Sequence, residues 1–175
     1  MNTVFPRVQT GPISEVVPGS LIKIQRSEGL LTSLVTSHVG KTGNRSFVTL
    51  NAKIVGRPRI FFAEDWSTPN CLSFANKLHF ELNVFDGISV DGRGYKWEDE
   101  PGVILASKSK LFLRAAPENA FYGTFRYLDV ETGDVLADVP PPYWSCGAWK
   151  ISIRDELTCK SVCLFEFDIT TANAN

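Results

Sequence analysis

Apolar and polar residues alternate along most of this chain, and that period of two limits its fold more than any other feature. The alternating segments are rich in Val, Ile, Phe, Thr and Tyr, and Gly, Pro, Asn and Asp stand between them. This is the pattern of β-strands joined by turns. Nine or more strands predict a mainly β protein, an antiparallel sandwich or barrel. The predicted strands are 20–25, 46–54, 59–63, 77–85, 103–107, 110–115, 122–130, 149–154 and 161–169.

Two other segments have a mixed pattern. The apolar residues of 30–38 fit one helical stripe, but the Ser and Thr residues between them favour an extended chain, so we expect a strand there. Thr68 could cap a helix that begins at Pro69, and the apolar spacing after it predicts a short helix over 68–78. We expect one or two short helices in the whole chain.

The length of 175 residues fits a single β-rich domain, 1–175. The segment 78–84 resembles 163–169, 85 residues later, with Phe and Glu at matching places. Two similar β units, 15–86 and 98–170, would explain this echo. One larger domain is the alternative, because short alternating strands resemble each other by chance.

Composition places the chain among globular proteins. Apolar residues make up 43% and charged residues 21%, which is typical of a compact fold. The first residues lack the basic and apolar regions of a secretory signal, and no apolar run approaches the roughly 20 residues of a membrane span. We therefore expect a soluble, cytoplasmic protein that does not bind membranes.

The four cysteines, Cys71, Cys146, Cys159 and Cys163, are unevenly spaced. Their spacing suggests neither a disulfide framework nor a common zinc motif, so reduced thiols are expected. No metal and no cofactor is predicted.

Charge is divided along the chain. The first sixty residues carry eight Lys/Arg and two Asp/Glu, whereas the remaining 115 carry ten and seventeen. The two parts differ in sign although the whole chain is near neutral. Segments of opposite charge can each attract a partner, or each other on a neighbouring copy.

No catalytic motif accompanies this pattern. The segment 40–44 imitates part of a phosphate-binding loop, but Val35 stands where that loop needs glycine, so a hairpin turn is expected. His38 and His79 lie outside any recognisable catalytic pattern. No catalytic residue is predicted, and we lean towards a protein that is not an enzyme.

Two regions mix aromatic rings with cations or prolines. Arg57, Arg59 and Phe61 alternate basic and aromatic side chains, a mixture that binds single-stranded nucleic acid in some β-sheet proteins. The run 140–144, three prolines followed by Tyr and Trp, fits a motif that proline-binding grooves read, although a rigid loop packed on the domain is the alternative. Other aromatic residues fall in or beside predicted loops, where exposed rings would suit a sugar or a flat protein partner, although packing in the core is the expected role of most of them. The candidate partner contacts are Arg57, Arg59, Phe61, Trp66, Trp97, Tyr143, Trp144 and Trp149.

Three functional hypotheses follow. The first is a non-enzymatic interaction or assembly protein that recognises another macromolecule, or itself as a homo-oligomer, through charged faces and proline/aromatic loops. The second is a small-ligand protein or enzyme with a pocket that holds His38 or His79 beside a carboxylate. The third is single-stranded nucleic-acid binding through the basic N-terminal third, which the acidic remainder of the chain disfavours.

Overall fold

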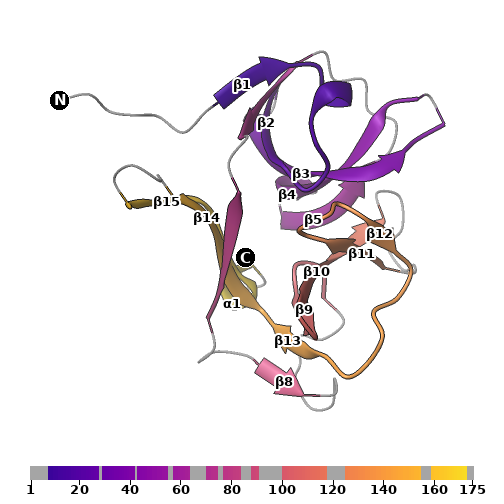
Figure 1. Ribbon diagram of the computed structural model, residues 1–175, viewed down its shortest axis with the longest axis vertical. Helices are drawn as coiled ribbons and strands as arrows, with labels where there is room; N and C mark the ends of the chain where they lie inside the picture. Colours follow the sequence, from indigo (N-terminus) through magenta and orange to yellow (C-terminus); the bar gives the residue numbers. More distant parts are fainter. Residues whose placement is uncertain are drawn as a thin grey trace.

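The computed structural model describes residues 8–27, 29–41, 43–54, 57–63, 70–74, 77–83, 88–90, 100–117, 125–154 and 159–172. These ranges contain fifteen strands, one short 3-10 helix and one short α-helix, which confirms the mainly β class. The elements, shown in Figure 1, are β1 (Val8–Gly11), η1 (Ile13–Glu15), β2 (Leu21–Arg26), β3 (Gly29–Val39), β4 (Arg45–Ile54), β5 (Arg57–Ala63), β6 (Cys71–Phe74), β7 (Leu78–Leu82), β8 (Ile88–Val90), β9 (Ile104–Ser107), β10 (Lys110–Pro117), β11 (Arg126–Asp129), β12 (Val135–Leu136), β13 (Trp144–Cys146), β14 (Ala148–Arg154), β15 (Ser161–Asp168) and α1 (Ile169–Ala172).

Twelve of these strands form one sheet. Its order is β1-β6-β2-β3-β4-β5-β10-β9-β13-β8, and β11 and β12 are attached beside β10. The described pairings are antiparallel except that of β5 with β10, where Phe61 and Phe62 pair in parallel with Ala116 and Pro117. This short link joins a first half, β1 to β6, to a second half, β8 to β13.

The other three strands form a separate sheet in the order β15-β14-β7, which lies beside the large sheet (Figure 1). Both outer strands pair with β14 in matching register. Ile151 of β14 stands between Phe80 and Phe165, and Lys150 stands between Glu81 and Glu166. The echo between 78–84 and 163–169 therefore has a local explanation, because both strands meet the same central strand. The duplication of two whole β units stays a prediction.

The main hydrophobic core lies between the two sheets. It contains Leu34 and Val48 from the first half, Leu113 from the second half, and Ile151 from the three-stranded sheet. A smaller cluster that includes Ile22 lies on the opposite face of the first half. Strands β2 to β4 are thus buried on both faces, as their apolar sequences require.

Two local predictions from the sequence are confirmed. The segment 30–38 is a strand, β3, and it pairs with both β2 and β4. The segment 40–44 is the hairpin turn between β3 and β4, closed by hydrogen bonds between Gly40 and Asn44 and between Gly43 and Gly40. Gly43 has a φ of +82°, a conformation that favours glycine.

The predicted helix over 68–78 is wrong. Residues 71–74 form β6, and residues from Leu78 onward form β7. Leu72 of β6 stands opposite Thr10 of β1 on one side and Lys23 of β2 on the other. Pairing on both edges satisfies the backbone of β6, and this tertiary contact outweighs the local preference for a helix.

In the described part of the chain, no helix has the length and apolar character needed to cross a lipid bilayer.

Candidate binding cleft

The predicted partner contacts lie in different environments. Arg57, Arg59 and Phe61 belong to β5, whose backbone is described but whose side chains at these positions are not. Trp66 and Trp97 lie outside the described residues. The remaining three aromatic residues are fully described, and the structure does not bring them together as one surface.

Trp149 is a core residue, which corrects its assignment as a partner contact. Its side chain is 2% exposed, and its ring centroid lies 5.3 Å from that of Phe167 and 5.7 Å from that of Phe165. Its indole Nε1 donates a hydrogen bond of 2.7 Å to the carbonyl of Gly102. Burial with a satisfied donor is the ordinary structural use of tryptophan.

The proline-rich run is anchored to the body of the protein. The Ser107 hydroxyl lies 3.1 Å from the carbonyl oxygens of both Pro140 and Pro142, so one shared donor holds the loop at two points. Tyr143 is half-buried against the main core. Trp144 is 53% exposed and remains a candidate surface contact.

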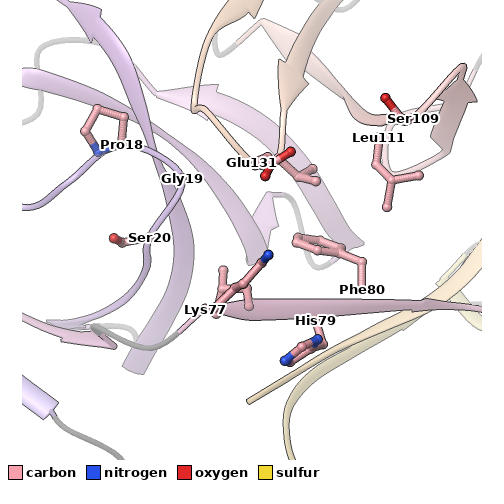
Figure 2. A pocket seen from close by; sticks show the side chains of 11 residues that line it. Pro18, Gly19, Ser20, Lys77, His79, Phe80, Ser109, Leu111 and Glu131 are labelled. Carbon is pink, nitrogen blue, oxygen red and sulfur yellow. The ribbon is translucent and has the colours of Figure 1, made fainter. Parts of the chain in front are cut away.

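A cleft of about 570 Å³ lies where four segments of the chain meet (Figure 2). This volume falls in the range of ligand sites in proteins. The segments are the turn before β2, strand β7, the β9–β10 turn with the start of β10, and the turn after β11. The lining residues are Pro18, Gly19, Ser20, Lys77, Leu78, His79, Phe80, Ser109, Leu111, Val130 and Glu131.

One wall of the cleft is made of two turns in close contact, 17–20 before β2 and 129–134 after β11, which are called the interlocked turns below. Gly19 and Gly133 both have positive φ, +81° and +76°. A Cβ on Gly19 would lie 2.6 Å from the carbonyl oxygen of Glu131, and a Cβ on Gly133 would lie 2.6 Å from the Cβ of Pro18. The two backbones approach this closely only because both positions lack a side chain.

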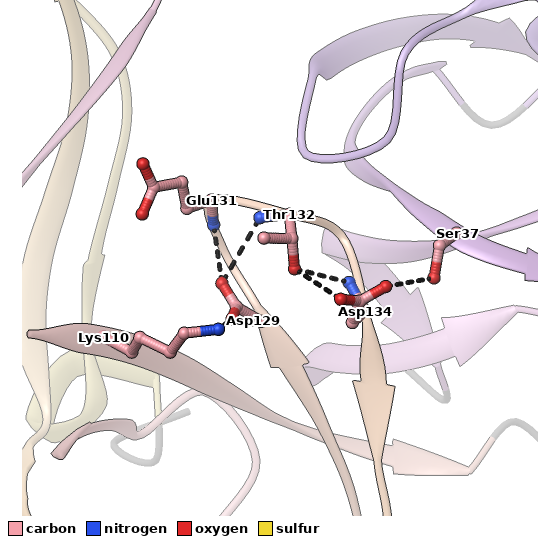
Figure 3. A network of polar contacts seen from close by, with 6 residues as sticks. All are labelled: Ser37, Lys110, Asp129, Glu131, Thr132 and Asp134. Atoms are coloured by element: carbon pink, nitrogen blue, oxygen red, sulfur yellow. Dashed lines mark hydrogen bonds and ion pairs between the residues drawn. The ribbon is translucent and has the colours of Figure 1, made fainter.

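The second of these turns, 129–134, is fixed by a polar network (Figure 3). The buried carboxylate of Asp129 accepts a hydrogen bond from Lys110 Nζ at 2.6 Å and from the backbone N–H groups of Glu131 and Thr132 at 3.1 and 3.3 Å. Asp134 accepts a hydrogen bond from the hydroxyl of Ser37 at 2.9 Å, which ties the turn to β3.

These contacts determine the charge state of Asp129. Burial alone raises the pKa of Asp129, but the Lys110 hydrogen bond, the two backbone donors and the lysine charge together hold that pKa below its ordinary value. The same pairing raises the pKa of Lys110. The carboxylate is thus ionised, and it keeps Glu131 in place at the cleft.

The opposite wall is the outer edge of β7, which carries free backbone groups. In the described part of the chain, β7 pairs only with β14. The N–H of Asn83 donates to Ala148 at 2.8 Å. Because hydrogen-bonded positions alternate in an antiparallel pair, His79 and Glu81 also direct their backbone groups at β14. The N–H and C=O groups of Leu78 and Phe80 therefore point away from β14, to the unpaired edge of β7.

Side chains of different character surround this edge. Leu78 and Phe80 pack on the main core, and Leu111 packs beside them. Lys77 and Glu131 are exposed, and neither forms an ion pair with any described residue. Figure 2 shows the amine of Lys77 and the ring of Phe80 on the side of β7 that faces Glu131. The cleft thus combines an apolar floor with one cation and one anion available to a ligand.

His79 is placed differently. It touches the cleft, but Figure 2 shows its ring on the side of β7 opposite to Phe80 and Glu131. The nearby Glu81 carboxylate is engaged with Lys150 at 3.0 Å and with the Ser152 hydroxyl at 3.1 Å. His38 lies on β3 and does not line the cleft. Within the cleft, the ring of His79 and the carboxylate of Glu131 thus lie on different sides of β7.

The described residues form no metal centre. Among the described residues, no group of three His, Cys, Asp or Glu side chains converges as a metal ion would require. The four cysteines are free, and burial raises the pKa of the Cys71 and Cys146 thiols.

Comparisons with protein-family models, with curated proteins and with solved structures give no significant match to this chain. Its function is therefore inferred from the chemistry of the cleft.

The sequence analysis did not predict the cleft. Gly19 and Gly133 are turn signals in their own segments, yet more than a hundred residues separate them. Lys77 and Glu131 have no motif around them, so their approach depends on long-range packing.

Proposed function

We propose that this protein is a non-enzymatic recognition module that binds a segment of a partner protein in the cleft between β7 and the interlocked turns. The main support for this proposal is the open cleft of about 570 Å³. Its two charged residues, Lys77 and Glu131, have no ion-pair partner among the described residues. Ligand clefts that place a few charged groups beside apolar side chains are typical of specific recognition.

The character of the lining favours binding over catalysis. Phe80, Leu78 and Leu111 offer apolar contact area, and Phe80 is held against Trp149 with a centroid distance of 6.3 Å. A ring that is fixed in this way gives up little conformational freedom when a ligand covers it. His79, by contrast, faces away from Glu131 (Figure 2).

A cytoplasmic location is part of this proposal. Cys159 and Cys163 are exposed free thiols, and a reducing compartment preserves such groups. The exposed Trp144 is a second candidate contact for a large partner.

The test is a selection from a displayed library of random peptides against the intact protein, followed by affinity measurement on the selected peptides. The key variant is the double reversal Lys77→Glu with Glu131→Lys. The matched control is Lys160→Glu, because Lys160 is also exposed but does not line the cleft. We expect the double reversal to weaken binding by about tenfold or more and the control to leave it unchanged.

Backbone amide shifts of the labelled protein locate the bound peptide. Changes centred on 77–80, Ser109 and Glu131 support the proposal. A selection that yields no peptide sensitive to the double reversal would overturn it. So would peptides whose shifts map away from the cleft, or binding only to single-stranded DNA tested in parallel, which would favour the third hypothesis.

A further inference from the structure

We infer that the partner segment enters the cleft in extended form and adds a strand to the free edge of β7. This inference rests on the proposed function and specifies how the ligand binds. The juxtaposition that carries it is an unpaired strand edge lying directly along an open cleft.

The first argument is the continuity of the lining along β7. Four consecutive residues, Lys77 to Phe80, line the cleft. Side chains of a strand alternate between its two faces, so one face of a strand would contribute only every second residue. Three successive residues of β7, with Lys77 just before them, include both faces of the strand, which indicates that the cleft reaches its edge.

The second argument is the set of hydrogen-bonding groups on this edge. The register with β14 leaves the N–H and C=O groups of Leu78 and Phe80, two residues that line the cleft, directed away from β14, and no described residue accepts from or donates to them. Backbone amides are strong donors and acceptors that seek partners. An extended peptide supplies both types at the same spacing, which is the basis of strand addition.

The third argument comes from the surroundings of the edge. Leu78 and Phe80 direct their side chains to the core side, where Leu111 and Val130 also line the cleft. Every second side chain of an added strand would face this apolar floor. The intervening side chains would lie on the side of His79. The amine of Lys77 lies on the floor side with Phe80 (Figure 2), so pairing with it favours an acidic residue at the floor-facing position of the added strand nearest Lys77.

The outer strand β15 offers a comparison within the same sheet. It too pairs only with β14 among the described strands. Its exposed residues Ser161 and Val162 do not line the cleft described above. A peptide at β7 would gain the side-chain contacts of this cleft in addition to backbone hydrogen bonds, which adds specificity to affinity.

Amide hydrogen exchange on the selected peptide complex tests the inference without altering the protein. We expect the N–H groups of Leu78 and Phe80 to become protected by about tenfold or more on binding. The N–H groups of His79 and Glu81 already donate to β14 and should change little. Equal protection along β7, or protection of none of these groups, would overturn strand addition.

Amide-to-ester replacement along the peptide gives an independent test. Each replacement removes one N–H donor with little change in size. We expect losses of about tenfold at every second position and only small losses between them. A peptide that responds to the Lys77/Glu131 double reversal but shows no period of two would overturn strand addition while leaving the proposed function in place.

A variant of β7 completes the design. Leu78→Pro removes the edge-facing N–H but none of the hydrogen bonds to β14, and Leu78→Ala controls for the lost side chain. We expect the proline variant to bind at least about tenfold more weakly than the alanine variant. If the edge amides of the free protein are already protected at high concentration and lose protection on dilution, the occupant is a second copy of this chain, and the partner-peptide assignment is wrong.

Discussion

Gly102 lies where the large sheet contacts the three-stranded sheet, and this contact requires a residue without a side chain. Its φ is +97°, its N–H donates to Arg114, and its carbonyl accepts the Trp149 indole. A Cβ at this position would collide with the ring of Phe167 and lie 3.0 Å from Ile60. The absence of a side chain therefore allows the tryptophan and phenylalanine rings to pack on the backbone.

We predict that Gly102→Ala lowers the free energy of unfolding by about 2–4 kcal/mol, because it combines backbone strain with overpacking. Gly43→Ala is the matched control. Gly43 also has positive φ, but nothing lies within 4 Å of a Cβ there, so only the strain of about 1–2 kcal/mol applies. Urea unfolding monitored by circular dichroism measures both, and equal losses would contradict the packing argument.

Asp129 gives the protein a pH dependence whose sign follows from its contacts. Its pKa is lower in the folded protein than in the unfolded chain, despite burial, because of Lys110 and the two backbone donors. The stabilisation is therefore present above the ordinary aspartate pKa of about 3.9 and is lost as the pH falls through the folded-state value.

We predict that Asp129→Asn lowers the free energy of unfolding by about 1–3 kcal/mol at pH 7. The difference from the wild type should shrink below about pH 4, where the wild-type carboxylate becomes protonated. Denaturant unfolding of both proteins at several pH values checks this. A difference that stays constant from pH 7 to pH 3 would show that the charge of Asp129 is not the cause.

At the level of elements, alternation predicted the strands that have a polar and an apolar face or a long apolar run. The strands β2, β4, β9, β10 and β14 follow the sequence pattern closely. Of the strands with four residues or fewer, β9 was predicted, but β1, β6, β8, β12 and β13 were not, because so few residues show little periodicity. β13, Trp144 to Cys146, has this length, and pairing with β8 and β9 defines it.

The binding cleft could not be predicted in the same way. Its floor comes from ordinary core residues such as Phe80, and its charges are isolated in the sequence. Which edge of β7 stays free depends on the position of β14, some seventy residues later in the chain. A local pattern contains no information about such a pairing.

At the level of the whole molecule, one core unites three groups of strands. Leu34 of the first half, Leu113 of the second half and Ile151 of the three-stranded sheet belong to the same cluster. Among the described residues, strand pairing between the halves is limited to the short parallel contact of β5 with β10, and the N–H of Ser37 adds one hydrogen bond of 2.7 Å to the carbonyl of Gly133. Side-chain packing, more than sheet continuity, therefore holds the halves together.

We predict that the described strands unfold in one cooperative transition, because loss of any group exposes the core of the others. Circular dichroism reports the strands, and the combined fluorescence of the four tryptophans, which include the buried Trp149, reports side-chain packing. The two denaturation curves should coincide. Two separated transitions would indicate that the halves are stable independently of each other.

In the cleft, the residues that hold the two turns together differ from the residues that supply its charge. Their contact is between backbones at Gly19 and Gly133, whereas Lys77 and Glu131 contribute charge without supporting either wall. Substitutions at these two charged positions can thus accumulate at little cost in stability. Substitutions at Lys77 and Glu131, natural or designed, can therefore change which partner the protein prefers, while Gly19 and Gly133 preserve the shape of the cleft.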